Sequence, residues 1–367
     1  MNGWIGKILR VNLTHQKLTV ESLDAKVAED YIGGRGLGLK YLYDEIDPSI
    51  EPLSEENKIM FATGPLTGTG ALAASRYTVV TKSPLTGAIA NSNSGGYFPA
   101  EMKFAGYDMI ILEGKAKEPT YLWIDNDQFE LRSAEELWGK DVNETTEWVV
   151  EQTHPEAKVV CIGPAGENLV KFAAIMNDKG RAAGRSGVGA VMGSKNFKAI
   201  AIRGTNGVSV ADPQGFMDNV AFAHEELKDP YMSETIAKYG TADVVEFSNE
   251  VGLLPTRNHQ QGTFESAAKI GGIALAKDYN LKGANRTKAC FSCPTACGRV
   301  TKVTEGKFKS SGEGPEYESM GALGSACGIS NLEAVIKGNH VCNEMGMDTI
   351  SAGSTIACAM ELFEKGL

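Results

Sequence analysis

Three cysteines lie close together in the second half of the chain, with two residues between the first pair and three between the second: Cys290, Cys293 and Cys297. Closely spaced thiolates on one loop can occupy three corners of an iron–sulfur cube, and the fourth ligand then comes from elsewhere. A zinc site of four cysteines, or of three cysteines and a histidine, is the alternative, but it usually contains two such close pairs. The spacing therefore favours an iron–sulfur cluster over zinc and over coincidence.

Two glycine-rich stretches carry polar residues that could bind an anion. They are Ser92–Tyr97, which includes Asn93 and Gly95, and Arg181–Gly189, which includes Ala182. Backbone N–H groups freed by glycine, beside an arginine fork, suit a phosphate group. Neither stretch is a Walker sequence, and residues 33–38 are not a Rossmann fingerprint. We interpret both stretches as loops, and although each alone is more often a plain turn, together they suggest an organic phosphate cofactor.

Arg76 and an acidic segment are further candidates for chemistry. Arg76 begins a β-branched run directly after a loop rich in Gly and Ala, where a surface arginine would need no explanation. In Glu313–Glu318, three carboxylates flank Tyr317, a pattern that suits general acid–base catalysis if it lies in a cleft. A solvated acidic loop is the alternative, and these residues alone favour it.

The elements that must position these residues change in character along the chain. Short β-branched runs, closed by Gly, Asn, Asp or Pro, predict strands in the first half. The runs are residues 5–13, 58–64, 77–82, 109–114, 121–125, 158–163 and 198–204. Only two or three helical patterns interrupt them, the clearest at 133–139 and at 143–153, where Asn143 would begin the helix. This is not a regular alternation of strand and helix, so it favours an α+β sheet domain over a doubly wound fold.

Beyond residue 208, apolar residues recur at helical spacing. Helices are predicted over residues 211–227, 233–247, 332–345 and 351–365. We therefore expect a β-rich domain over residues 1–208 and a mainly helical domain over residues 209–367.

Composition excludes several classes of protein. The 367 residues include 36 Lys and Arg against 46 Asp and Glu, a net charge of −10 that speaks against nucleic-acid binding. Neither an N-terminal leader nor an apolar stretch of membrane-spanning length is evident, so we expect no membrane association. Seven cysteines are an odd number that suits a reducing compartment, which predicts a cytoplasmic protein. Four of them are predicted to be buried and inert: Cys161, Cys327, Cys342 and Cys358.

Taken together, the motifs resemble those of the tungsten-containing aldehyde ferredoxin oxidoreductases. The resemblance rests on the cysteine spacing, the Gly-Pro-Glu-Tyr-Glu segment downstream of it, the two glycine-rich stretches and the opening Trp-Ile-Gly-Lys-Ile-Leu-Arg-Val-Asn-Leu, and it extends from Gly3 onward. It implies an N-terminal platform of two β-sheets for a tungsten or molybdenum ion, held by the dithiolenes of two pterins. Helical domains would cover this platform.

The resemblance also implies metal sites. Cys290, Cys293 and Cys297 match three ligands of the family's [4Fe–4S] cluster. Asn93 and Ala182 match the residues whose backbone carbonyls bind the Mg²⁺ ion that the two pterin phosphates share.

Four further residues are implied in cofactor binding. Gly95 and Arg181 match phosphate or pterin contacts, and Arg76 matches an arginine between the pterin and the cluster, where a fixed cation can hydrogen-bond to both. Asp348 ends a segment similar to the family's first pterin-binding motif, Asp-x-x-Gly-Leu-Asp, from which Asn343 and Met347 depart.

Tyr317 and Glu318 match the polar pair beside the metal, where the glutamate moves a proton as water or hydroxide attacks an aldehyde carbon. The implied activity is the oxidation of small aldehydes to carboxylic acids with water. Electrons would pass from a tungsten or molybdenum bis-pterin centre, through the cluster, to ferredoxin or another electron carrier.

Family chains run further and use a C-terminal domain for the fourth cluster cysteine, a second pterin motif and a histidine, and we expect this chain to lack that domain. Two alternatives stay open. One is a related reductase that acts on an aromatic acyl-CoA or another carbonyl compound. The other is a non-catalytic or split-gene fragment that binds cofactor or partner. A separate partner chain that supplies the C-terminal half would complete such a fragment. A homodimer is the other assembly that we expect.

Overall fold

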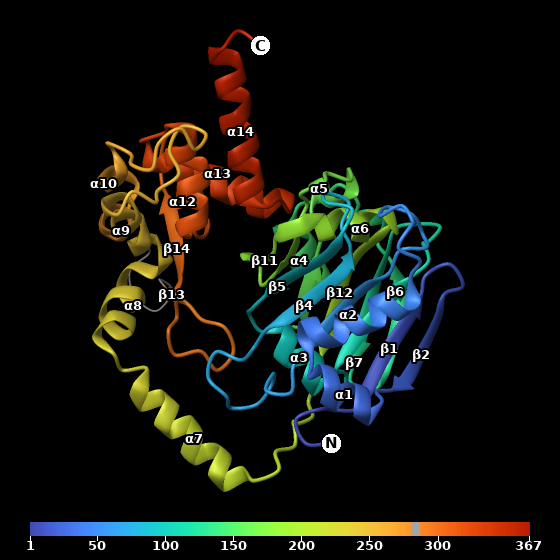
Figure 1. Cartoon of the computed structure of the whole chain (residues 1–367). Coiled ribbons are helices and arrows are strands. Elements are labelled where there is room, and N and C mark those ends of the chain that lie inside the picture. The colour runs from blue at the N-terminus through green and yellow to red at the C-terminus, as the bar shows by residue number, and fades with distance from the viewer. Residues whose placement is uncertain (280–286) are drawn as a thin grey trace. The chain divides into compact units, whose positions relative to one another are not determined.

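The computed structural model describes residues 1–279 and 287–367. The chain divides into two compact units (Figure 1). Unit 1 comprises Met1–Phe222, Cys290–Cys293 and Glu344–Met347, and unit 2 comprises Ala223–Ala289, Pro294–Asn343 and Asp348–Leu367. Two short segments of the second half thus belong with the β-rich unit, which the sequence pattern does not reveal. The domain limits 1–208 and 209–367 stay a prediction.

Unit 1 contains two mixed sheets of six strands each. The first has the order β2-β1-β6-β3-β4-β5. Its strands are β1 (Lys7–Asn12), β2 (Lys17–Ser22), β3 (Ile59–Thr63), β4 (Tyr77–Lys82), β5 (Ile89–Ser94) and β6 (Met109–Glu113). Within it, β1 and β6 run parallel and the other neighbours run antiparallel.

The second sheet has the order β11-β10-β9-β12-β7-β8. Its strands are β7 (Thr120–Asp125), β8 (Gln128–Ser133), β9 (Lys158–Cys161), β10 (Ile175–Asn177), β11 (Arg181–Ala183) and β12 (Phe197–Arg203). Here β7 and β12 run parallel, and the other pairs are antiparallel.

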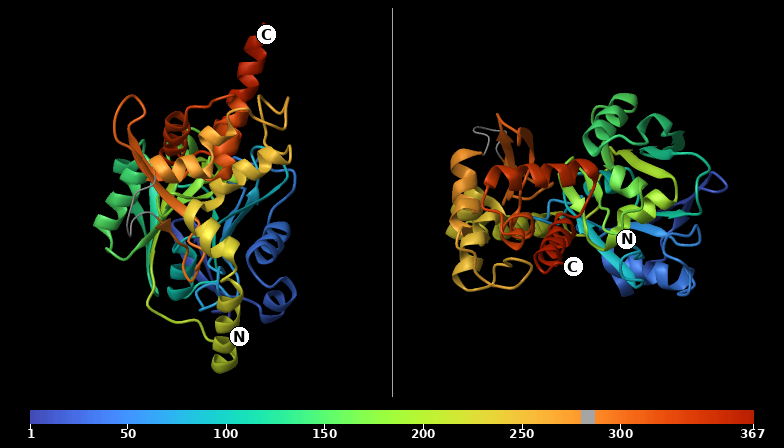
Figure 2. Two further views of the ribbon diagram at one scale, coloured as in Figure 1. Left: turned by 90° about the vertical axis from the view of Figure 1, so that its left-hand side faces the viewer. Right: turned by 90° about the horizontal axis from the view of Figure 1, so that it is seen from above.

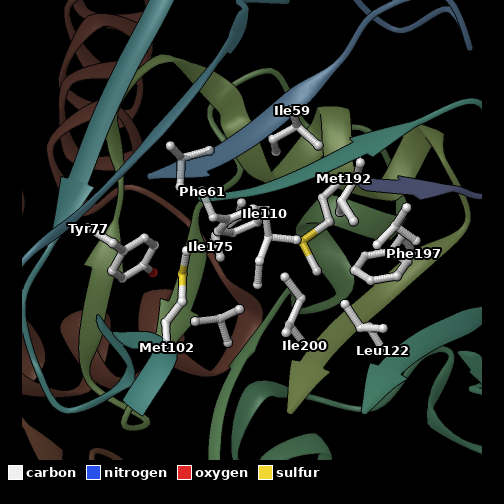
Figure 3. Close-up of a cluster of buried hydrophobic side chains, with 14 of the residues drawn as sticks. Ile59, Phe61, Tyr77, Met102, Ile110, Leu122, Ile175, Met192, Phe197 and Ile200 are labelled. Atoms are coloured by element: carbon white, nitrogen blue, oxygen red, sulfur yellow. The ribbon is translucent and has the colours of Figure 1, made fainter. Parts of the chain in front are cut away.

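The main hydrophobic core of unit 1 combines residues of both sheets (Figure 3). Phe61 and Ile110 of the first sheet share one buried cluster with Leu122 and Ile200 of the second. Strand β3 is buried on both faces: Ile59 and Phe61 belong to this core, while the alternate residues belong to a second cluster. This explains why β3 reads as a continuous apolar run instead of an alternating one.

Helices cover the outer faces of the two sheets. α1 (Ala25–Tyr31) and α2 (Gly34–Glu45) pack on the first sheet, and α4 (Val142–Gln152) packs on the second. Figure 2 (right) shows these two groups on opposite sides of the strands. α4 begins at Val142 because Asp141 and Glu144 form a capping box, so the predicted start at Asn143 is wrong by one residue.

Four more α-helices lie in unit 1 or begin there. They are α3 (Phe98–Phe104), α5 (Pro164–Glu167), α6 (Val188–Ser194) and α7 (Pro213–Glu226), of which α7 includes the boundary at Phe222.

Unit 2 is mainly helical. Its helices are α8 (Ala237–Tyr239), α9 (Val244–Glu250), α10 (Ala267–Ile270), α11 (Gly272–Asp278), α12 (Tyr317–Leu323), α13 (Leu332–Met345, ending in unit 1) and α14 (Thr349–Glu364). A small sheet joins β13 (Thr287–Lys288), β14 (Gly298–Val303) and β15 (Ser310–Glu313). With the two sheets of unit 1, this confirms the predicted α+β class.

Two expectations about unit 2 are wrong. The helix predicted over residues 233–247 is broken into short helices, because Gly240 has φ +68° and ends α8. Cys161, Cys327 and Cys342 are buried as predicted, but Cys358 is exposed, since α14 buries only Ala352, Gly353 and Ala357. In the described ranges, no helix combines the length and the apolar character needed to cross a bilayer.

Candidate functional site

Arg76 and Asn93 lie side by side in unit 1. Arg76 immediately precedes β4, and Asn93 is on the neighbouring strand β5, opposite Thr78. Arg76 Nε donates a hydrogen bond to Asn93 Oδ1 at 3.0 Å. Both side chains are exposed, so the guanidinium keeps N–H groups that can bind an anion beside this amide.

Cys290 lies against the loop that follows β5. A Cβ atom on Gly95 would be 2.7 Å from Cys290 Sγ, closer than real Cβ atoms come to another atom. Glycine at position 95 therefore leaves room for this thiol, which any other residue would not. The residues that follow Cys290 and Gly95 are joined by a backbone hydrogen bond, in which Phe291 N–H donates to Gly96 O at 3.2 Å.

The segment after Cys290 is further fixed by aromatic and backbone contacts. The Phe291 ring makes edge contacts with Phe104 and Tyr97, at centroid distances of 5.6 and 6.4 Å. Ala73 N–H donates to Ser292 O at 3.1 Å. Unit 1 therefore holds Cys290 and Cys293 by local packing and hydrogen bonds, next to the residues at the ends of β4 and β5.

Asn177 holds the loop that follows β5 through its side-chain amide, a role that its residue type and sequence position do not indicate. It is 1% exposed at the end of β10. Its Oδ1 accepts from Tyr77 Oη at 3.1 Å and from Ser94 Oγ at 2.8 Å, while its Nδ2 donates to Gly95 O at 2.9 Å. Burial raises the pKa of Tyr77, so this phenol stays a hydrogen-bond donor. One amide thus connects both sheets to the glycine that faces Cys290.

Asp178 continues this network. Its Oδ2 accepts from Tyr97 N–H at 2.8 Å and from Asn177 Nδ2 at 2.9 Å. Gly96 has φ +92°, and a Cβ atom there would collide with the Asp178 carboxylate. Burial raises the pKa of Asp178, against the hydrogen bonds that lower it. The Asn-Asp-Lys-Gly turn directly before Arg181 was the sequence signal that could have revealed this pair.

Arg181 and Ala182 form part of β11, which lies beside β5. Arg181 pairs with Asn177 and Ala182 pairs with Met176 across the β10–β11 hairpin. The Arg185 N–H, just after β11, donates to Ser92 Oγ at 3.1 Å. The interpretation of both glycine-rich stretches as loops is therefore wrong in part, because Asn93, Arg181 and Ala182 are on strands.

Tyr317 and Glu318 begin helix α12 in unit 2. Glu316 is the N-cap residue, and Tyr317 is half-buried while Glu318 is exposed. Tyr317 N–H donates to Thr241 Oγ1 at 3.1 Å, and the Thr241 hydroxyl donates to the Glu316 carboxylate. The segment is thus an ordered helix start, and the alternative of a solvated acidic loop does not describe it.

Cys297 and Asp348 also belong to unit 2. The Asp348 carboxylate caps α14, where it accepts from the N–H groups of Ile350 and Ser351 and from Ser351 Oγ at 2.6 Å. In residues 1–279 and 287–367, no group of three or more His, Cys, Asp or Glu side chains is arranged to hold a metal ion. The roles of the three cysteines as cluster ligands and of Asp348 as a pterin contact stay predictions.

The residues of unit 1 fit the groups that the sequence implies. Thiolates are the protein ligands that iron–sulfur clusters use. Because Gly95 has no Cβ atom, there is space for the Cys290 thiol beside it. Arg76 and the β5–β11 pair offer a guanidinium and backbone groups, which suit a phosphorylated cofactor.

Comparison with known proteins settles the family. The model of the aldehyde ferredoxin oxidoreductase N-terminal domain matches residues 8–204, and the model of domains 2 and 3 of the same enzymes matches residues 220–367. The chain belongs to the aldehyde ferredoxin oxidoreductase family. The expectation that it lacks the family's C-terminal part is wrong for residues 220–367, which match the domain 2 and 3 model.

Members of this family from two Pyrococcus species are similar over the whole chain. The tungsten-containing aldehyde ferredoxin oxidoreductases of Pyrococcus furiosus and Pyrococcus abyssi are 51% and 52% identical to it. These matches cover 100% of this chain and 60% of each relative, so the chain spans about three fifths of the length of these relatives.

A solved structure is similar as well. It is the active-site complex BamBC of benzoyl coenzyme A reductase with 1,5-dienoyl-CoA, matched with a TM-score of 0.86 and 30% identity, over 100% of this chain and 56% of the other.

Proposed function

We propose that this protein oxidises aldehydes to carboxylic acids and passes the electrons to ferredoxin. The balanced half-reaction is RCHO + H₂O → RCOOH + 2 H⁺ + 2 e⁻. The observation that carries the proposal is the arrangement of Arg76, Asn93 and Gly95 beside Cys290 in a member of this family. The relatives named as tungsten enzymes support tungsten as the metal.

We expect a bis-pterin tungsten centre, Mg²⁺ and a [4Fe–4S] cluster in the functional protein. When bound, the metallopterin supplies the two-electron redox chemistry. Cys290, Cys293 and Cys297 would bind the cluster, and Asn93 and Ala182 would offer backbone carbonyls to Mg²⁺. Arg76, Gly95, Arg181 and Asp348 would contact the pterin or its phosphates.

The protein's own residues would accept the proton that is released during the reaction. Glu318 is exposed at the first turn of α12, so its carboxylate is free to accept a proton from the water or hydroxide that attacks the aldehyde carbon. Tyr317 precedes it and would hydrogen-bond the substrate oxygen through its hydroxyl. We also expect a cytoplasmic protein that uses a soluble electron carrier. A homodimer or a separate partner chain stays a prediction.

The test is aldehyde-dependent reduction of a viologen dye by anaerobically purified protein. Glu318→Gln should lower kcat by about 10²- to 10⁴-fold, the usual contribution of general acid–base catalysis. Glu305→Gln, at an exposed residue of the same unit, should leave kcat unchanged. Full activity of Glu318→Gln would remove Glu318 from the mechanism.

The similarity to the benzoyl coenzyme A reductase complex favours a second candidate, reduction of an aromatic acyl-CoA thioester. Oxidation of a reduced dye by benzoyl-CoA, without any response to aldehydes, would support it. Protein that contains neither tungsten nor molybdenum and is inactive in both assays would support a non-catalytic fragment.

A further inference from the structure

The hydroxyl of Thr241 joins two backbone segments of unit 2. Thr241 lies in the short 3-10 helix Gly240–Asp243 and is half-buried. Its Oγ1 accepts from Tyr317 N–H at 3.1 Å and donates to the Glu316 carboxylate. It therefore contacts both residues at the start of α12, directly before Glu318.

This contact replaces a missing helix cap. The first N–H groups of an α-helix have no partner inside the helix. Glu316 is the N-cap residue but makes no side-chain hydrogen bond to the backbone of α12. The Thr241 hydroxyl donates its proton to the Glu316 carboxylate, which leaves a lone pair on Thr241 Oγ1 to accept the hydrogen bond from Tyr317 N–H. A residue distant in sequence thus fixes the first turn of α12.

The segment before Thr241 is itself anchored at the turn that carries Cys297. Gly240 has φ +68°, and a Cβ atom there would lie 2.6 Å from Cys297 O. Arg299, 2% exposed, donates to Ile236 O at 2.6 Å and to Ala296 O at 2.7 Å. One guanidinium therefore binds both the chain that leads to Thr241 and the turn that ends at Cys297.

We propose that Thr241 is a positioning residue that holds Tyr317 and Glu318 in place relative to the Cys297 turn. The inference rests on the proposed function, because it assumes that Glu318 transfers a proton. Small displacements of a reacting group are costly: an error of about 1 Å can lower the rate by about 100-fold. Thr241 would prevent such a displacement without touching the substrate.

The experiment compares Thr241→Val, which removes the hydroxyl, with Thr241→Ser, which keeps it. We expect Thr241→Val to lower kcat by about 10- to 100-fold, within the range that misplacement produces, with KM nearly unchanged. Thr241→Ser should restore most of the rate. Independently of activity, hydrogen exchange at the Tyr317 amide should be faster in the Val variant and close to wild type in the Ser variant.

Metal content and thermal unfolding serve as controls for folding. If the Val methyl group, which is larger than a hydroxyl, disrupts the close contact with Glu316, Thr241→Ala removes the same hydrogen bonds without added volume and should show the same kcat and exchange changes.

The outcomes separate the two claims. Unchanged exchange at Tyr317, or wild-type kcat despite faster exchange, would overturn the role of Thr241 while an inactive Glu318→Gln variant still supported the proposed function. Wild-type kcat in Glu318→Gln would overturn the proposed role of Glu318, and with it the inference about Thr241.

Discussion

Arg76 Nε hydrogen-bonds Asn93 Oδ1 across the β4–β5 pair at 3.0 Å, so the amide fixes the direction of the guanidinium. Arg76→Lys cannot keep this fork, because lysine offers a single ammonium group. We expect activity to fall by about 10- to 100-fold, as is typical when an outer partner of a metal centre is lost. Tungsten content and dye reduction measure the effect. Arg132→Lys, on β8 of the same unit, is the control and should match wild type.

Cys290 and Cys358 provide a matched pair of cysteine variants. We expect Cys290→Ser to lose iron and sulfide and the visible absorption of an iron–sulfur cluster, because a serine oxygen is a poorer ligand for iron than a thiolate. Cys358→Ser, at an exposed thiol on α14, should keep all three. Equal iron in the two variants would contradict the assignment of Cys290 as a cluster ligand.

Alanine variants of Gly96 and Gly139 distinguish the cost of backbone strain from the cost of a steric clash. The φ values of the two glycines are +92° and +90°, so an alanine is similarly strained at both positions, by about 1 to 3 kcal/mol. A Cβ atom meets nothing within 4 Å at Gly139, whereas at Gly96 it collides with the Asp178 carboxylate. Gly96→Ala should therefore unfold at a clearly lower temperature than Gly139→Ala. The reverse order would show that Asp178 does not hold the β5 loop.

His340 should make unit 2 sensitive to acid. Burial lowers its pKa from 6.5 to about 4, and Nδ1 is buried without a hydrogen-bond partner among the described residues. Since the unfolded chain binds the proton first, the stabilisation is complete above pH 6.5 and is lost as the pH falls toward 4, by about 3 kcal/mol at most.

Denaturant unfolding between pH 4 and pH 7 measures this contribution. His340→Gln should flatten the pH dependence of the free energy of unfolding, because glutamine does not bind a proton in this range. An equally steep dependence in His340→Gln would assign the acid sensitivity to other groups.

The sequence predicted elements well where one apolar pattern decides the structure. Strand β4 (Tyr77–Lys82) and helix α13 (Leu332–Met345) have the predicted limits, because β-branched and helical apolar patterns determine them locally. Strand β5 was missed because its Ala-Asn-Ser-Asn-Ser sequence is polar. Its Ser94 side chain is buried by a hydrogen bond to Asn177, a partner 83 residues away.

The candidate site shows the same division. Cys290 and Arg76 could be found from residue type and spacing, since thiolates and guanidinium groups have recognisable chemistry. Asn177 and Thr241 could not, because an amide or a hydroxyl acquires its role only from partners that the fold brings to it. Spacing also gave no information on which unit each cysteine joins, and Cys297 belongs to a different unit from Cys290.

Strands β5 and β11 are the outermost strands of their sheets and lie beside each other, and both carry residues that we propose to contact the cofactor. An edge strand has a row of backbone N–H and C=O groups to which a strand from another molecule can add, the first step of aggregation. A cofactor bound along these edges would cover the backbone groups to which such a strand could add. Protein synthesised without tungsten should therefore be the less soluble form, so metal supply during expression would govern yield as well as activity.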